Sequence, residues 1–255
     1  MPNKHQERVF FLMDIPIDNV TMDQAIAMIW ARMEEKTPSE MHFVNAHCIN
    51  VAAKDPVYHE ILKQSKAVFA DGTGIRKAGE KLGHPIVDNV NGTDLFPLIC
   101  TECKRTGKSV FLLGGKPGVA EKSAQWSRSH AQGDVIAGFH DGFFTDADAL
   151  IKEINASQAD LLLVGMGVPR QEKWLHEHLG ALTVPVVMGV GGLFDFYSGT
   201  ISRSPLWMRR MGIEWVWRLM MEPRRMWKRY IIGNVAFLIR INMIKRAQQK
   251  QRKKR

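Results

Sequence analysis

The sequence predicts a doubly wound, Rossmann-like α/β body followed by a basic, amphipathic helical appendage. Two observations predict the body: short apolar runs alternate with segments of helical periodicity, and these runs are apolar throughout, as in a mostly parallel sheet covered by helices on both faces. A change of composition near residue 200 predicts the appendage. We therefore expect a body over residues 1–200 and an appendage over residues 201–255.

Six runs are typical of buried strands, namely residues 42–45, 67–71, 109–115, 135–139, 160–167 and 185–192. Helix starts lie between them. Thr21 and Gln24 have the spacing of a capping box, Pro117 opens a second helical segment, and Thr145 precedes a third. The first 20 residues lack a signal-peptide cleavage site, and no apolar run approaches the roughly 20 residues that span a bilayer. We expect neither a signal peptide nor a membrane-spanning helix.

Charge divides the chain in the same place. The net charge is +9, yet residues 203–255 hold 16 Lys and Arg against two acids, so the first 202 residues are net acidic. The same tail holds four of the seven tryptophans. A hydrophobic content of 45% excludes disorder of the whole chain, and three cysteines are too few for a disulfide framework, which indicates a reducing compartment.

The tail pattern favours a membrane surface over two alternatives. Residues 205–223 predict one helix, with Met208, Met211, Trp215 and Leu219 on one face and Glu214 paired with Arg218. Basic residues mixed with Trp, Tyr and Ile at helical spacing are typical of a helix lying on anionic lipid. Nucleic acid would attract the same charges, but the apolar bulk of the tail argues against it. Packing of the tail on the body remains open, and the last eight residues are expected to fray.

Polar groups and glycines follow the predicted strands. Because parallel strands bring their carboxyl ends to one edge, these groups should line a common crevice. They are Asn45, Asp71, the loop of Gly114, Gly115 and Lys116, the loop of Gly165 and Gly167, and Gly191. Glycine loops ahead of helices suit a phosphate or diphosphate. Neither a Walker loop nor a GxGxxG order is present, so a nucleotide is expected without NAD or ATP, and without a metal or cofactor.

Asp71 has two interpretations. Flanked by Gly72 and Gly74 at a strand end, it could be a partly desolvated base with a raised pKa. It could also cap the helix that follows, which local sequence alone favours. Asp146 and Asp148 resemble a metal-binding pair but better fit a helix start, and Cys100 and Cys103 better fit a helix with a buried cysteine than a zinc site.

Eight blocks in order give the chain its resemblance to a known family. They are Asn45-Ala, residues 69–72, 92–94, 111–117, 141–144, 165–172, 189–192 and 212–218. Over residues 10 to 230 the sequence resembles the WecG/TagA/CpsF glycosyltransferases. The resemblance implies an inverting enzyme that moves a sugar from a UDP-sugar to a polyprenyl-diphosphate-linked sugar, in the synthesis of bacterial surface polysaccharide. Glucose, N-acetylmannosamine and its uronic acid are the implied sugars.

The resemblance also implies roles for individual residues. Asp71 becomes the general base, Asn45 and Gln171 line the catalytic pocket, and Gly72, Asn89 and Asp94 flank the substrates together with the glycine loops. Arg218 and either Arg224 or Arg225 become contacts of the diphosphate. The chain departs from the family pattern at Phe43, where many members carry Thr, and at Asn89, where many carry Arg.

The implied partners are a UDP-sugar donor, a polyprenyl-diphosphate-linked acceptor and an anionic membrane surface, with no nucleic acid and with self-association open. The implied location is cytoplasmic, peripheral to the inner face of the cell membrane. The alternative function is that of a non-catalytic nucleotide- or nucleic-acid-binding protein with a basic tail.

Overall fold

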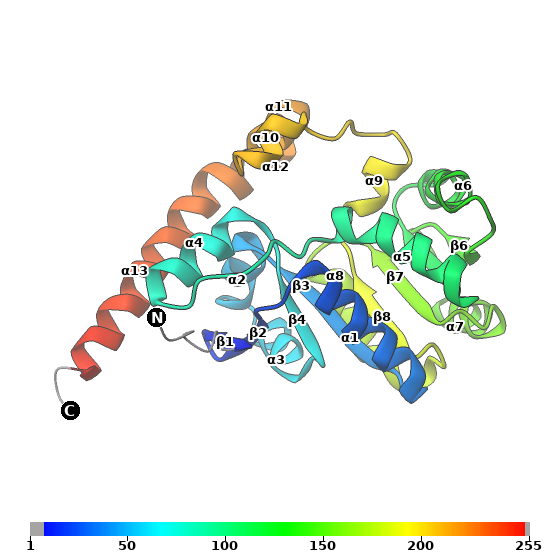
Figure 1. Cartoon of the computed structure of the whole chain (residues 1–255), viewed down its shortest axis with the longest axis horizontal. Helices are drawn as coiled ribbons and strands as arrows, with labels where there is room; N and C mark the ends of the chain where they lie inside the picture. Colours follow the sequence, from blue (N-terminus) through cyan, green and yellow to red (C-terminus); the bar gives the residue numbers. More distant parts are fainter. Residues whose placement is uncertain (1–7, 253–255) are drawn as a thin grey trace.

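An eight-stranded sheet forms the centre of the molecule (Figure 1). The structure is a computed structural model that describes residues 8–252; residues 1–7, part of the segment expected not to be a signal peptide, lie outside this range. The strand order is β1-β2-β4-β3-β8-β7-β5-β6. Strands β3 to β8 run parallel, which confirms the predicted fold class. They are β3 (Ser39–Val44), β4 (Ala67–Ala70), β5 (Val110–Gly114), β6 (Ile136–His140), β7 (Leu161–Gly165) and β8 (Val186–Gly189).

The sequence analysis missed a hairpin at one edge of the sheet. β1 (Val9–Leu12) and β2 (Ile15–Asp18) pair antiparallel, and β2 then adds in parallel to β4. Two four-residue strands, one of them containing Pro16, give too short an alternation to stand out. The Asp18 carboxylate accepts a hydrogen bond from the Val68 N–H at 2.9 Å, which joins the hairpin to the parallel strands.

Helices cover both faces of the sheet. One face carries α1 (Met22–Glu35), α5 (Gly92–Thr106), α6 (Val119–Ala131) and α9 (Leu193–Tyr197). The other carries α2 (Ala46–Ala52), α3 (Pro56–Gln64), α4 (Gly72–Leu82), α7 (Ala147–Ala156) and α8 (Arg170–His178), and a 3-10 turn (Leu179–Ala181) follows α8. Strands β3, β4, β5, β7 and β8 are buried between these layers, which explains why they are mostly apolar on both faces, whereas β6 at the sheet edge is half-exposed.

Two of the three predicted helix starts are confirmed, whereas Pro117 does not open its helix, because α6 starts at Val119 with Gly118 at its N-cap. Thr21 and Gln24 form the predicted capping box of α1. The Asp146 carboxylate accepts a hydrogen bond from the Ala149 N–H at 2.9 Å and so caps α7, as the helix-start interpretation predicts. Cys100 and Cys103 are both free and buried on α5, which confirms the helical interpretation of that segment.

The tail forms α10 (Leu206–Arg210), α11 (Glu214–Met221), α12 (Pro223–Trp227), a π-helical turn η2 (Lys228–Ile232) and α13 (Gly233–Arg252). The single helix predicted over residues 205–223 is wrong, because the chain breaks at Gly212, whose φ is +70°. The shared face is wrong for the same reason: Met208 is buried whereas Met211 is exposed. Residues 248–252 are helical rather than frayed.

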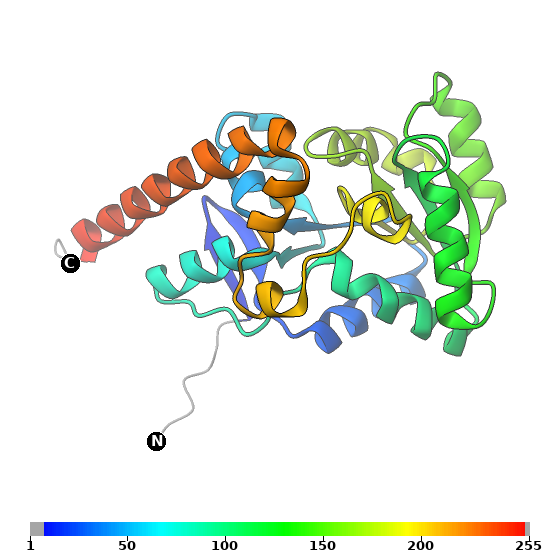
Figure 2. The same cartoon turned by 90° about the horizontal axis from the view of Figure 1, so that it is seen from above.

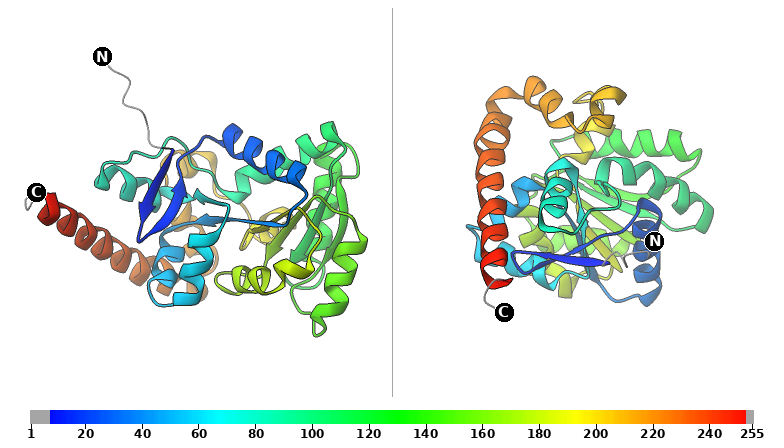
Figure 3. Two further views of the ribbon diagram at one scale, coloured as in Figure 1. Left: turned by 90° about the horizontal axis from the view of Figure 1, so that it is seen from below. Right: turned by 60° about the vertical axis from the view of Figure 1, so that its left-hand side comes forward.

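α13 lies along one side of the body, against α2 and α4 (Figures 2 and 3). Phe237 and Ile241 are buried with Val44 and Ile75 in the core beneath these helices. Packing on the body therefore accounts for one face of α13. Over residues 8–252 no helix is both long and apolar enough to cross a membrane. The division of the chain after residue 200 stays a prediction.

Candidate active site

The register of two neighbouring strands places Asn45 beside Asp71. Val44 at the end of β3 pairs with Ala70 at the end of β4, so the next residue of each strand lies at the same point of the sheet edge. The Asn45 side-chain amide donates to Asp71 Oδ2 at 3.1 Å. Its Oδ1 accepts the N–H groups of His47 and Cys48 at 3.0 and 3.2 Å, which caps α2 and fixes the amide orientation.

Asp71 does not cap the helix that follows it. It occupies the N-cap position of α4, but its side chain makes no capping hydrogen bond. Asn89 instead accepts the Gly72 N–H on Oδ1 at 2.5 Å. The interpretation of Asp71 as a helix cap is therefore wrong, and among residues 8–252 no donor bonds its second oxygen, Oδ1. A carboxylate held at one oxygen by an amide keeps the other oxygen for chemistry.

The surroundings of Asp71 favour its protonated form more than water does. Burial raises the pKa of the Asp71 carboxyl to about 6, against the lowering effect of the Asn45 hydrogen bond and of the Arg229 charge. The carboxylates of Glu214 and Asp94 add to the increase. A pKa near 6 leaves the group ionised at neutral pH and able to take up a proton, which suits a general base.

Gln171 joins two of the glycine loops. It is buried, and its Oε1 accepts the N–H of Gly167 at 3.0 Å and that of Gly191 at 2.9 Å. Its Nε2 donates to Glu172 at 2.8 Å, and burial raises the pKa of the Glu172 carboxyl to about 7. Gln171 therefore fixes the loops after β7 and β8 relative to each other.

The third glycine loop packs against the first two. The Gly115 N–H donates to the Gly165 carbonyl at 3.1 Å, and a Cβ on Gly114 would lie 2.5 Å from that carbonyl oxygen. The backbone N–H groups of Gly115, Gly167 and Gly191 are therefore bonded within the protein. Their role in binding phosphate stays a prediction, and it requires these hydrogen bonds to open. Lys116 is exposed on this loop and makes no ion pair with the described residues.

Asp94 connects the body to the start of the tail. Its Oδ1 accepts a hydrogen bond from the Arg203 guanidinium at 2.5 Å, and its Oδ2 accepts the side-chain amide of Asn91 at 2.7 Å. Arg203 also lies 3.8 Å from Glu214, so Glu214 pairs with Arg203 and not with Arg218 as the sequence predicted. Asp94 is thus engaged in holding residues 203–214 over the sheet edge.

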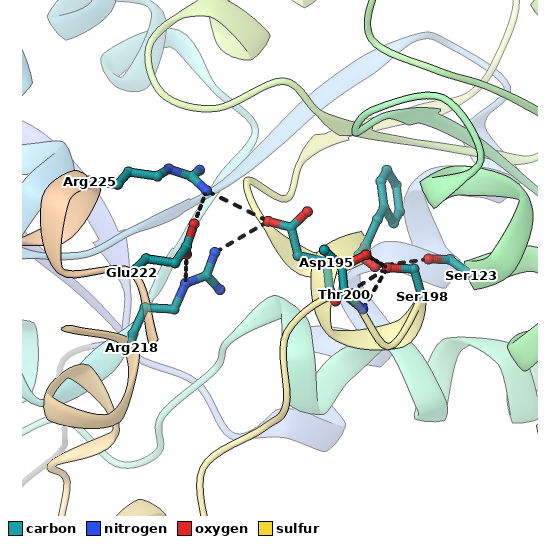
Figure 4. A network of polar contacts seen from close by, with 8 residues as sticks. Ser123, Asp195, Ser198, Thr200, Arg218, Glu222 and Arg225 are labelled. Carbon is teal, nitrogen blue, oxygen red and sulfur yellow. Dashed lines mark hydrogen bonds and ion pairs between the residues drawn. The ribbon is translucent and has the colours of Figure 1, made fainter. Parts of the chain in front are cut away.

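Arg218 belongs to a four-residue ionic network (Figure 4). Its Nε donates to Glu222 at 2.7 Å, and its Nη2 donates to Asp195 at 3.3 Å. Arg225 donates to Glu222 at 2.8 Å and lies 3.9 Å from Asp195. A Cβ on Gly192 would lie 3.0 Å from the Arg218 guanidinium, so this cation rests on the glycine loop after β8. Arg224 is exposed and lies outside the network.

A hydroxyl joins the tail to the turn that carries Asp71. Thr73 Oγ1 donates to the Gly212 carbonyl at 2.9 Å. Farther along, the Asn50 side-chain amide on α2 donates to the Gly233 carbonyl at 2.7 Å. The tail therefore contacts the helices that begin directly after Asn45 and Asp71.

Four residues near the site were missed by sequence reasoning. Thr73 is two residues from Asp71 but carries no motif of its own, and Asp195 lies in a short apolar helix. Glu214 was assigned to a different partner. Arg229 stands among many tail cations, and nothing in the sequence separates it from the others. Only the folding of the tail over the body shows which of these residues approach Asp71.

A doubly wound sheet binds its ligands at the carboxyl edge, and a desolvated carboxylate with a raised pKa at that edge is typical of an enzyme's functional site. The chain belongs to the WecG/TagA/CpsF family of glycosyl transferases, whose family model matches residues 10–253. The protein is therefore a glycosyltransferase, and the non-catalytic alternative is not supported.

Two relatives carry the same name, N-acetylglucosaminyldiphosphoundecaprenol N-acetyl-beta-D-mannosaminyltransferase. The chain is 30% identical to the protein of Staphylococcus aureus strain MW2 over 247 residues, which cover 96% of this chain and 94% of that one. It is 30% identical to the protein of Bacillus subtilis strain 168 over 199 residues, which cover 78% and 77% of the two chains.

Proposed function

We propose that this glycosyltransferase moves a hexose or N-acetylhexosamine-type sugar from a UDP-sugar to a polyprenyl-diphosphate-linked sugar, with inversion, in bacterial surface polysaccharide synthesis. The observation that carries the proposal is the state of Asp71: bonded at one oxygen by Asn45, unbonded at the other, and partly desolvated. A single carboxylate of this kind suits a direct displacement.

Asp71 acts as the base of that displacement. As the acceptor hydroxyl attacks the anomeric carbon, its proton passes to Asp71 Oδ1, the new C–O bond forms, and the bond between the anomeric carbon and the UDP oxygen breaks on the opposite face. One displacement inverts the anomeric configuration. Asn45 holds the carboxylate in place during the transfer, and Asn89 holds the Gly72 amide beside it.

Arg218 and Arg225 are the proposed contacts of the donor diphosphate. They lie next to the glycine loop after β8, where a leaving UDP would be stabilised by positive charge. Asp195 and Glu222 bond both guanidinium groups, so the donor has to compete with two carboxylates. This competition favours a doubly charged phosphate group over a weaker anion.

N-acetylmannosamine is the first donor sugar to test. Both relatives are named for its transfer to undecaprenyl-diphosphate-linked N-acetylglucosamine. Glucose and N-acetylmannosaminuronic acid remain candidates, because Phe43 and Asn89 replace residue types common in the family. Asn89 is directly bonded to the turn after Asp71, so this replacement lies within the site.

We also propose that residues 201–255 hold the catalytic body, residues 1–200, at the inner face of the cell membrane. Most of the large exposed apolar side chains of the described chain lie in the tail. We call the following set the tail surface: Trp207, Met211, Met220, Met221, Trp227, Ile231, Ile232, Val235, Leu238, Ile239 and Met243. Apolar side chains interspersed with Lys and Arg fit an anionic lipid interface.

A substrate panel tests the function. The purified full chain is incubated with UDP-N-acetylmannosamine, UDP-N-acetylmannosaminuronic acid, UDP-glucose or UDP-N-acetylglucosamine, each with a prenyl-diphosphate-linked N-acetylglucosamine. The proposal expects UDP release that depends on the acceptor and a product of inverted anomeric configuration by NMR. A retained configuration, or no acceptor-dependent release with any sugar of the panel, contradicts it.

A further inference from the structure

The tail carries a partly buried cation without an anionic partner. The Nε atom of Arg229 is buried and has no hydrogen-bond partner, and within residues 8–252 its guanidinium makes no ion pair. The group lies over the Tyr230 ring, 5.4 Å from its centroid. Burial of an unpaired guanidinium costs free energy, so a site that keeps one is suited to a bound anion.

Contacts on either side of Arg229 hold it over the catalytic edge. The Gly233 carbonyl, at the end of η2, accepts the Asn50 amide from α2. Phe237 lies 3.7 Å from the position that a Cβ on Gly74 would take, in the first turn of α4. The Tyr230 ring faces Trp215 of α11 at a centroid distance of 5.9 Å. These contacts place the segment from η2 to Phe237 of α13 against α2 and the first turn of α4, the two helices that follow Asn45 and Asp71.

The positive charge of Arg229 acts on titratable groups at the starts of α2 and α4. Burial and, to a lesser extent, this charge lower the pKa of the His47 imidazole to about 4, and the same charge opposes the increase that burial causes in the pKa of the Asp71 carboxyl. The other charged groups that act on Asp71 are Glu214 and Asp94, and both are acids. Arg203 pairs with those two acids, and Arg218 pairs with Asp195 and Glu222. Three charged side chains of the described residues therefore act on Asp71, and Arg229 is the cation among them.

We propose that Arg229 binds a phosphate oxygen of the lipid-linked acceptor and so positions the acceptor hydroxyl beside Asp71. The inference rests on the proposed function. The acceptor is favoured over the donor because Ile231 and Ile232 follow directly and are half-exposed on the tail surface. A diphosphate bound at Arg229 would leave its prenyl chain next to these side chains, whereas Arg218 lies at the glycine loop on the donor side and Arg225 shares its carboxylate partners.

Direct binding tests this assignment without requiring turnover. Three probes are titrated by calorimetry in detergent: farnesyl-diphosphate-linked N-acetylglucosamine, the farnesyl glycoside that lacks the diphosphate, and UDP. Arg229→Gln should weaken the first probe by about tenfold or more, the loss expected for one charged hydrogen bond. It should leave the other two within about twofold. Lys77→Gln, which removes one exposed charge from α4, is the matched control and should change none of them.

The outcomes separate the two phosphate sources. A loss of UDP affinity with unchanged binding of the prenyl diphosphate would assign Arg229 to the donor site and overturn the proposal. Unchanged binding of both probes would also overturn the proposal. Arg229→Lys keeps the charge and should recover most of the lost affinity; if a correctly folded Lys variant binds no better than Gln, the charge has no role. Absence of transfer by the wild type in the substrate panel would refute the proposed function but not this binding assignment.

Discussion

At the scale of single residues, Asp71, the proposed base, lowers the stability of the fold. Its carboxyl is partly desolvated and lies near two other acids, while Asn45 bonds only one of its oxygens. A neutral side chain at position 71 would stabilise the fold more than the carboxylate does. A partly buried carboxyl with a shifted pKa is typical of functional sites, where the shift is part of the mechanism.

The stability cost should be measurable through pH. Because the folded pKa is about 6 and the ordinary value is 3.8, the folded protein binds the proton more tightly than the unfolded chain does. The ionised carboxylate therefore destabilises the fold above pH 6; the cost shrinks as pH falls through 6 and is absent below 3.8. Asp71→Asn should raise the free energy of unfolding by about 1–2 kcal/mol at pH 8 and by much less at pH 4. Urea denaturation at the two pH values checks this, and equal effects at both would contradict the desolvation.

Sequence reasoning identified the polar residues of the site but not their bonds. Asn45 and Asp71 could be predicted because each follows an apolar strand. Whether Asp71 caps α4 depends on Asn89, which lies 17 positions away from Gly72 and takes over that amide. Likewise, Gln171 was expected in the pocket, and its actual bonds to Gly167 and Gly191 depend on how two loops pack. The hydrogen-bond partners of these side chains depend on tertiary contacts, which the local sequence does not encode.

At the scale of elements, the break between α10 and α11 decides how the tail meets the body. A continuous helix over residues 205–223 would carry no kink and would not present the Gly212 carbonyl to Thr73. Gly212 has a φ of +70°, and a Cβ on it would lie 2.5 Å from Thr73 Oγ1. The periodicity of the segment hid this break, because apolar residues at helical spacing continue through it.

Two glycine variants separate the effect of backbone strain from that of the contact between Gly212 and Thr73. Gly199 has a similar φ of +75° but open space around its Cβ position. Gly199→Ala should therefore cost about 1 kcal/mol through strain alone, whereas Gly212→Ala should cost about 1–2 kcal/mol more and displace the tail. Thermal unfolding measures the stability, and hydrogen exchange of residues 206–221 measures the displacement. Equal costs and equal exchange would show that the contact with Thr73 does not hold the tail.

The strands were more predictable than the hairpin for a physical reason. All six predicted strands are present; five of them are buried on both faces and form mostly apolar runs, while β6 lies at the opposite edge of the sheet and is half-exposed. β1 and β2 lie at the sheet edge, where four residues suffice and Phe11 is exposed. Edge strands carry less apolar signal because less of their surface is buried.

At the scale of the whole molecule, α13 has two apolar faces, one packed against the body and one exposed. Phe237 and Ile241 are buried against the body, while Val235, Leu238 and Ile239 on the same helix are exposed. The sequence predicted the basic, apolar character of the tail, but only the fold shows which residues are left for an outside partner. Because α13 completes part of the core, the tail surface is best tested by substitution and not by truncation.

Vesicle binding tests the tail surface. The triple variant Val235→Ser, Leu238→Ser and Ile239→Ser should reduce co-sedimentation with vesicles containing phosphatidylglycerol by about tenfold or more, because each side chain loses apolar burial in lipid. Phe143→Ser, at an exposed site on the body, is the control and should bind like the wild type. Unchanged binding of the triple variant would contradict the membrane assignment. A loss of self-association by sedimentation velocity instead would assign the surface to a second copy of the chain.

The proposed mechanism depends most on proton transfer to Asp71, and the turnover of Asp71→Asn tests this step most directly. An asparagine can still accept the Asn45 hydrogen bond but cannot take up the acceptor proton. With UDP binding and circular dichroism unchanged, the initial rate of acceptor-dependent UDP release should fall by about a hundredfold or more. A rate within about threefold of the wild type would contradict the assignment of Asp71 as the base.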